Sequence, residues 1–135
     1  MSEISTAPDI GALDVPVDAW TEPFWAAAEK GELTLPRCTD CARFRWPPGP
    51  FCPHCHSQRV EWRASGPARV YSFTVVRNQD AKLHVPALVE FPEADGVRIL
   101  AAIVDKAIED IRIGAALRVH WSRAANVSVP IFSLA

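Results

Sequence analysis

The segment Cys38-Thr-Asp-Cys41, followed after ten residues by Cys52-Pro-His-Cys55, contains all four cysteines of the chain. Each Cys-x-x-Cys pair can bend so that its two sulfurs face one point, and a hairpin between the pairs brings all four sulfurs together. Four thiolates in a tetrahedron at about 2.3 Å from a central ion suit Zn²⁺. The spacing therefore predicts a structural zinc site in a ribbon of short strands.

Other chemistries of four cysteines are less consistent with this sequence. A disulfide framework requires an oxidising compartment, and residues 1–14 lack the apolar region of a secretion signal. A dithiol redox site ordinarily uses one Cys-x-x-Cys pair. Rubredoxin-type iron usually has a longer separation and a glycine after each pair, where this chain has Ala42 and His56. Iron stays the alternative to zinc, and no cysteine remains as a catalytic nucleophile.

Charge and length limit the classes of function. The net charge of −2 argues against a nucleic-acid-binding protein, which normally presents a basic face. The sequence has no apolar run long enough to span a membrane. We therefore expect a cytoplasmic protein with no membrane span and no nucleic-acid partner. The zinc segment alone is too small to fold on its own core, so the metal must supply part of its stability.

The first half of the chain divides into three segments. Residues 1–17 show no periodicity and are expected to form a flexible tail. Residues 18–32 predict a short helix that ends at Gly31, with Thr21 as its N-cap and with Trp20 and Trp25 at the spacing of a hydrophobic staple. Residues 33–65 predict the zinc ribbon.

The second half, residues 66–135, predicts an all-β domain that begins at the break Gly66-Pro67. Tyr71 and Phe73 are expected on one face of its first strand, and Val70 on the other. Five short strands with one small connector fit an OB-fold barrel, although a small open sandwich is the competing interpretation. The expected strands are 68–76, 86–91, 97–104, 115–121 and 129–132.

An ordered set of motifs across most of the chain resembles a known family of bacterial and archaeal proteins. The set includes Phe24-Trp25-Ala-Ala-Ala-Glu-Lys-Gly31, the two cysteine pairs, Pro47-Pro48, Ser65-Gly66, residues 70–76 and Ile113-Gly114. The family joins a rubredoxin-like zinc ribbon to a C-terminal OB fold and was long classed as a domain of unknown function. The chain departs from the family pattern at turns, where Ala42, His56 and Ala68 replace glycines.

The resemblance implies an accessory role in acyl-CoA metabolism. Family members are similar to small subunits that assemble with thiolase-like enzymes, lipid-transfer-type aldolases or enoyl-CoA hydratases. The partner carries the chemistry, and the small subunit stabilises it and helps shape the channel for CoA or its acyl group. We therefore expect a partner subunit of this kind, acyl-CoA as a ligand of the complex, and no catalysis by the chain alone.

Two further groups of residues are candidates for contacts. Trp20, Phe24 and Trp25 belong either to the core or to a helix that docks on the partner. Three basic residues are candidates for contacts with CoA phosphates, although solvated strand edges are the simpler explanation: Arg77, Lys82 and Arg98.

Two rival functions remain open from the sequence. The first is a nucleic-acid-binding module in which Tyr71 and Phe73 stack on bases. The second is a free-standing acyl-CoA carrier or hydrolase. Single-strand binding would favour the first, and thioester turnover by the isolated chain would favour the second.

Overall fold

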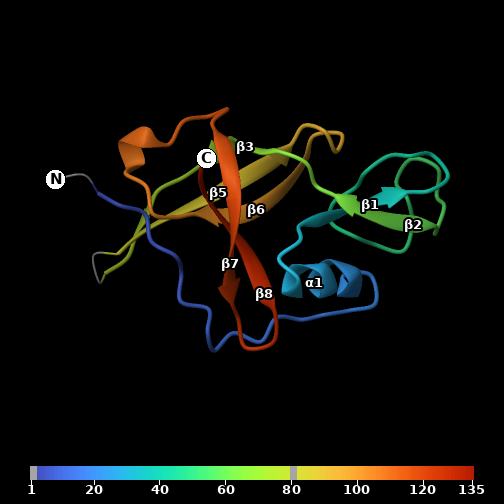
Figure 1. Cartoon of the computed structure of the whole chain (residues 1–135), viewed down its shortest axis with the longest axis horizontal. Coiled ribbons are helices and arrows are strands. Elements are labelled where there is room, and N and C mark those ends of the chain that lie inside the picture. The colour runs from blue at the N-terminus through green and yellow to red at the C-terminus, as the bar shows by residue number, and fades with distance from the viewer. Residues whose placement is uncertain (1–2, 80–81) are drawn as a thin grey trace.

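A computed structural model of the protein describes residues 3–79 and 82–135. A β-barrel forms one part of the molecule, a two-stranded ribbon lies at the opposite end, and the single α-helix lies between them (Figure 1). None of the helices in the described part of the chain is long and apolar enough to cross a membrane. The elements are α1 (Glu22–Glu29), β1 (Thr34–Cys38), β2 (Val60–Ala64), β3 (Ala68–Phe73), β4 (Val76–Arg77), β5 (Leu83–Phe91), β6 (Val97–Ile103), η1 (Ile108–Asp110), β7 (Ala116–Arg123) and β8 (Ser128–Leu134).

Five strands close the barrel in the order β3-β7-β8-β6-β5, and β5 returns to pair with β3. Neighbouring strands are antiparallel except β6 and β8, which are parallel where Ile103 meets Phe132. The 3-10 turn η1 lies between β6 and β7, where the sequence predicts a connector. This closed five-stranded order is that of an OB fold, so the predicted barrel is confirmed and the open sandwich is excluded.

The barrel core follows from the alternation of side chains along each strand. In β5 every second side chain from Leu83 to Phe91 is buried, because successive residues of a strand point to opposite faces. Phe91 of β5 meets Phe132 of β8 in the centre, with 6.5 Å between the ring centroids. These two residues are the largest of the fully buried side chains.

The first barrel strand departs from the predicted alternation. Its pairing with β5 shifts between Val70 and Ser72, which marks a β-bulge. Val70 is buried, Tyr71 is exposed, and Phe73 packs against the core. The extra residue of a bulge reverses the alternation that follows it, so the prediction of Tyr71 and Phe73 on one face was wrong.

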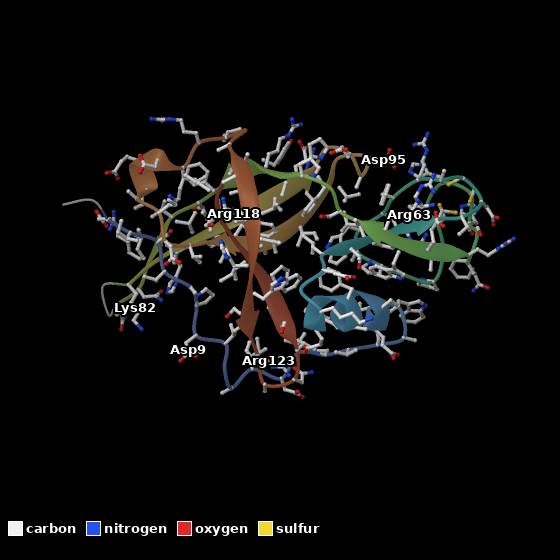
Figure 2. The ribbon with its side chains drawn as sticks, viewed as in Figure 1. Asp9, Arg63, Lys82, Asp95, Arg118 and Arg123 are labelled. Atoms are coloured by element: carbon white, nitrogen blue, oxygen red, sulfur yellow. The ribbon has the colours of Figure 1, made fainter. Side chains whose placement is uncertain are left out.

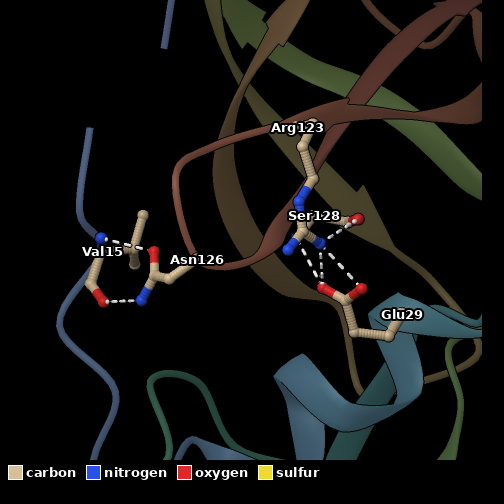
Figure 3. A network of polar contacts seen from close by, with 5 residues as sticks. All are labelled: Val15, Glu29, Arg123, Asn126 and Ser128. Carbon is tan, nitrogen blue, oxygen red and sulfur yellow. Dashed lines mark hydrogen bonds and ion pairs between the residues drawn. The ribbon is translucent and has the colours of Figure 1, made fainter. Parts of the chain in front are cut away.

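The N-terminal segment was expected to be a flexible tail; its first two residues lie outside the described part of the chain. From residue 3 onward it lies along the barrel. The Ser5 side chain is fully buried, and its main chain bonds to Lys106 and Asp105. Farther along, the side-chain amide of Asn126 accepts a hydrogen bond from the Val15 N–H and donates one to the Val15 carbonyl (Figure 3). These contacts join sequence-distant residues, which is why local composition gives no sign of them.

Thr21 is the N-cap residue of α1, as predicted, but the expected side-chain cap is absent. Thr21 makes no side-chain bond to the helix, and instead its hydroxyl accepts the N–H of Asp18. The carboxylate of Asp18 accepts the N–H groups of Trp20 and Thr21 at 3.0 and 2.9 Å. Asp18 and Thr21 therefore form a reciprocal capping box in the turn before α1.

The other end of α1 is fixed to the barrel by charge. Glu29 accepts two bonds from Arg123 of β7, at 2.6 and 2.7 Å, and a third from the Ser128 N–H at the start of β8 (Figure 3). Both Arg123 bonds come from the same nitrogen, Nη1, and together with the Ser128 bond they tie the end of α1 to β7 and β8.

Candidate metal centre and candidate contact residues

The ribbon is built on one antiparallel pair of strands. In β1 and β2 the register runs from Thr34 opposite Ala64 to Cys38 opposite Val60. Residues 44–46, which follow the first cysteine pair, make only an isolated bridge between Phe44 and Arg37. The ladder cannot continue through the following prolines, because proline has no N–H to donate.

Each cysteine pair closes with the same set of main-chain bonds. The Ala42 N–H donates to the Cys38 carbonyl at 2.9 Å, and the His56 N–H donates to the Cys52 carbonyl at 2.9 Å. The N–H of Cys38 donates to the Arg43 carbonyl at 2.9 Å, and that of Cys52 to the Ser57 carbonyl at 2.8 Å. The two pairs are thus copies of one local turn.

These turns bring the four sulfur atoms into one cluster. The Sγ atoms of Cys38, Cys41, Cys52 and Cys55 all lie within 4.8 Å of one another, and two of the pairs are 3.6 Å apart. In a tetrahedron with metal–sulfur bonds of about 2.3 Å, the sulfurs are about 3.8 Å apart. The yellow sulfur atoms gather in the loops of the ribbon (Figure 2). The donor set and its spacing therefore fit a bound metal ion of the kind that zinc ribbons hold.

The main chain favours the thiolate form of the first cysteine in each pair. The N–H of Cys55, followed by that of His54, lowers the pKa of Cys52 to about 6. The N–H groups of Cys41 and Asp40 lower the pKa of Cys38 in the same way. For Cys55 the N–H of Ser57 acts in the same direction, but desolvation and the neighbouring sulfurs raise the pKa to about 12. Four adjacent thiolates repel one another, and a divalent cation offsets half of their negative charge and reduces that repulsion.

Polar side chains connect the two cysteine turns. The Ser57 hydroxyl donates to the Asp40 carboxylate at 2.5 Å, and Arg59 lies 3.6 Å from the same carboxylate. On the strands, Arg37 donates to Glu61 at 2.6 Å and lowers the pKa of that carboxyl. These contacts hold the two turns at a fixed separation around the sulfurs.

Two positions next to the cluster have backbone strain that glycine would relieve. Ala42 and His56 have φ values of 66° and 63°, in the left-handed region that a Cβ disfavours by roughly 1–2 kcal/mol. We expect Ala42→Gly to raise the midpoint of thermal unfolding by a few degrees, because the relieved strain exceeds the added entropy of the unfolded chain. Differential scanning calorimetry of the metal-loaded protein checks this, with Ala125→Gly on the barrel as the matched control. A lower midpoint for Ala42→Gly than for the control contradicts it.

The histidines add no ligand to this cluster. The groups of potential ligands among the described residues comprise the four cysteines alone, although His54 and His56 flank Cys55. His84 contacts the Thr6 carbonyl at 3.1 Å, and His120 contacts the Ser133 hydroxyl at 2.7 Å.

The three aromatic candidates for partner contact separate in the structure. Phe24 is only 3% exposed and lies among Trp25, Trp46 and Trp62, with ring centroids 4.9, 5.2 and 6.4 Å away. Trp25 is half-buried against the same core, whereas Trp20 is 49% exposed. Phe24 is therefore a core residue, which is one of the two interpretations that the sequence left open for this group. Of the three, Trp20 alone presents a large exposed surface.

The three cationic candidates do not form one site. Arg77 binds the carboxylate of Glu3, and the Asn78 N–H donates to the Lys82 carbonyl, so Arg77 and Lys82 flank one hairpin. Lys82 lies at the end of the barrel far from Arg63 of the ribbon (Figure 2). Arg98 pairs with Glu90 at the other end of β5, about 23 Å along the strand. One cluster of phosphates cannot contact all three residues.

Arg98 is also engaged by two partners. Its guanidinium lies 3.6 Å from the centroid of the Tyr71 ring and 3.6 Å from Glu90, which also binds Arg69 at 2.5 Å. The Tyr71 ring therefore already carries a stacked cation. Stacking of a nucleic-acid base on it requires that Arg98 be displaced.

Sequence reasoning missed Arg45, which follows the first cysteine pair. Arg45 is only 7% exposed. From the sequence alone, an arginine at this position is expected to lie in solvent. Only the packing of the ribbon against the start of α1 reveals its burial.

Comparison with known protein families matches both parts of the fold. Residues 25–61 match the family described as "ChsH2, rubredoxin-like zinc ribbon domain", and residues 61–122 match "ChsH2, C-terminal OB-fold domain". Together the two matches cover the end of the helix from residue 25, the cysteine cluster and most of the barrel.

Two curated relatives are similar in sequence. The chain is 36% identical over 118 residues to a probable enoyl-CoA hydratase alpha subunit of Thermomonospora curvata, covering 81% of this chain and 36% of the relative. It is 32% identical over 83 residues to a DUF35 domain-containing scaffold protein of Methanocaldococcus jannaschii, covering 58% of this chain and 59% of the relative. The chain thus spans about a third of the first relative and about three fifths of the second.

Two solved structures are similar in fold. A chain of the Ltp2-ChsH2(DUF35) aldolase matches with a TM-score of 0.79 and 30% identity, covering 90% of this chain and 98% of that one. A DUF35-family protein of unknown function from Sulfolobus solfataricus matches with a TM-score of 0.65 and 17% identity, covering 88% and 87% of the two chains. The cysteine cluster, the barrel and these matches agree, and the protein therefore belongs to the ChsH2/DUF35 family, which joins a rubredoxin-like zinc ribbon to a C-terminal OB fold.

Proposed function

We propose that this protein is a small non-catalytic subunit of an acyl-CoA-processing complex, in which it stabilises a thiolase-like aldolase or acyltransferase partner. The observation that carries the proposal is the likeness to the Ltp2-ChsH2(DUF35) aldolase, whose matched chain is covered almost completely. A chain of the same extent and similar fold can present a surface at the same place to a partner. The relative named as a hydratase subunit supports the same class of CoA thioester chemistry.

The metal in this proposal is Zn²⁺ with a structural role. Four protein sulfurs complete a tetrahedral site, which leaves no position at which the ion could bind a substrate or activate water. When bound, the ion would cross-link the two cysteine turns and take no part in a reaction. The cysteines hold it, and Asp40 and Ser57 keep the two turns together.

The positions of the reactive side chains support a non-catalytic role for this chain within the complex. All four cysteines lie in the metal cluster, and the ring nitrogens of His84 and His120 contact a carbonyl and a hydroxyl. A nucleophile needs an activating base and an orienting group beside it. The Ser133 hydroxyl has a base at 2.7 Å in His120, but the contacts of His120 among the described residues include no group that orients its other ring nitrogen. We therefore assign the covalent chemistry to the partner.

A cavity on the barrel is the part of this chain that we propose lines the acyl channel of the complex. It has a volume of about 300 Å³ and lies between α1, β6, β8 and the N-terminal segment. Trp25, Trp46, Leu100 and Ile131 contribute to its largely apolar lining. Hydrocarbon from an acyl chain gains about 0.8 kcal/mol per buried methylene on such a surface. The phosphates of CoA would then lie on the partner, since the cationic candidates here are engaged or far apart.

We expect the protein to co-elute in stoichiometric amounts with a thiolase-like aldolase subunit of the same organism when the two are co-expressed. The isolated chain should not turn over acyl-CoA substrates, and the complex should. Size-exclusion chromatography followed by a thioester assay measures both, and a hydratase subunit expressed in place of the aldolase tests the second class of partner. Separate elution from both partners, or turnover by the isolated chain, contradicts the proposal.

A further inference from the structure

A buried, unpaired arginine lies between the ribbon and the start of the helix. Arg45 is 7% exposed, and one of its terminal nitrogens, Nη2, donates to the Gly49 carbonyl at 3.1 Å. Its Nε and Nη1 atoms are buried and have no hydrogen-bond partner among the described residues. The ion pairs of the described chain involve other arginines. The structure thus leaves a permanent positive charge without a counter-charge.

Such a charge is costly unless an anion joins it. A guanidinium stays protonated in proteins, so burial cannot neutralise it, and its donors need acceptors. Desolvating an unpaired charge costs several kcal/mol, whereas a hydrogen-bonded pair recovers much of that cost. The environment of Arg45 therefore favours the arrival of an oxyanion.

The space for that anion is a small cavity beside Arg45. Its volume is about 80 Å³, and its lining includes Trp20 and Pro23 near the start of α1, Pro48 of the loop, and Val60 and Trp62 of β2. Arg45 is the one charged side chain among the residues that line it. The cavity thus presents apolar walls and a single cationic group.

This combination selects the kind of occupant. A free phosphate would lose its water against apolar walls on most sides. A glutamate or aspartate side chain places its methylene groups against those walls and its carboxylate on the guanidinium. Trp20 and Val60 line the cavity and are 49% and 39% exposed, so a protein surface delivering that side chain would also cover them.

We propose that this cavity receives an acidic side chain of a partner protein, whose carboxylate binds Arg45. The chemistry of the cavity is independent of the proposed function, whereas the identification of the partner as the thiolase-like subunit rests on it. In the complex, the acidic residue would neutralise the buried charge and fix the register of the ribbon on the partner. A pair of this kind gives specificity, because a partner without the carboxylate leaves the charge desolvated and unpaired.

The first test uses the metal-loaded full chain alone. We expect Arg45→Met to unfold at the same temperature as the wild type or a higher one, since it removes an uncompensated buried charge and keeps the volume. Arg43→Met, which changes an exposed arginine two residues away, is the matched control. A substantially lower midpoint for Arg45→Met than for Arg43→Met would show that Arg45 has a structural partner, and would overturn the proposal.

The second test probes the cavity with a small carboxylate. In a protein labelled with ¹⁵N-arginine, the guanidinium N–H resonances of Arg45 should shift saturably with sodium propionate but not with sodium chloride of equal ionic strength. Concentrations up to roughly 100 mM saturate even millimolar sites. No shift beyond the chloride control overturns the proposal. A larger response to inorganic phosphate than to propionate also overturns it, because a free anion would then be the better occupant.

The third test measures assembly. With the thiolase-like partner, Arg45→Met should weaken the complex at least tenfold and Arg43→Met should not. Equal affinity of the two variants overturns the role of Arg45 in docking. If the wild type does not bind that partner, the proposed function fails, and the propionate titration alone decides whether the cavity is a carboxylate site.

Discussion

Replacing one sulfur of the cluster, in Cys52→Ser, should abolish stoichiometric zinc binding and unfold the ribbon. Structural zinc contributes about 10 kcal/mol or more in isolated zinc-finger peptides, which is as large as the whole stability of a typical domain. The ribbon has one pair of five-residue strands, and the core that it shares with α1, through Leu35, Trp46 and Trp62, is too small to replace that contribution. The barrel has its own core around Phe91 and Phe132 and should keep its fold.

Elemental analysis and ¹H–¹⁵N NMR measure the two effects separately. Wild-type protein should contain one zinc per chain, and Cys52→Ser should lose the dispersed signals of residues 34–64 while it keeps those of the barrel strands. The matched control is His54→Ala, which changes an exposed residue inside the same cysteine pair and should bind zinc normally. Zinc-free wild-type protein, or an ordered ribbon in Cys52→Ser, would refute the assignment.

Loss of zinc on acidification is also expected, since the ligand sulfurs bind the metal as thiolates.

The features that the sequence predicts correctly are those encoded locally. Two Cys-x-x-Cys pairs define a cluster because each pair and its turn occupy a few consecutive residues. The barrel follows from short alternating strands, of which β7 is the clearest: Leu117 is buried, and Arg118 and His120 are exposed. The position of the connector between β6 and β7 also matches the prediction, whereas the order in which the strands pair is seen only in the structure.

The features that it predicts poorly depend on contacts between distant residues. The bulge at Tyr71 arises from the fit of β3 against β5, and the burial of Ser5 depends on Lys106. Arg45 shows the same limit for function, because its neighbours in the sequence give no sign that the ribbon and the helix enclose it. The phosphate candidates do not form one site for a related reason: Arg77 and Arg98 pair with opposite ends of β5, and the sequence does not show that register.

The second large effect expected is on stability, from Phe24→Ala. Phe24 holds the helix, the loop before Pro47 and β2 together through its contacts with Trp25, Trp46 and Trp62. Truncation of a fully buried phenylalanine usually costs about 3–5 kcal/mol, through lost burial and the cavity that remains. We expect a loss of that size in chemical denaturation of the metal-loaded protein, with the slope of the transition unchanged.

The contrast with Trp20→Ala decides between core and docking roles for the helix. Trp20 lies one turn before Phe24 but is about half exposed, so its truncation should change the stability of the free subunit by less than about 1 kcal/mol. The same truncation should weaken the complex with the partner, because Trp20 borders the cavity beside Arg45. We therefore expect different effects from the two variants: Phe24→Ala should lower the stability of the subunit, and Trp20→Ala should lower its affinity for the partner.

A small stability loss in Phe24→Ala would mean that the aromatic cluster does not hold the helix to the ribbon. Unchanged affinity in Trp20→Ala would place the docking surface elsewhere on the molecule.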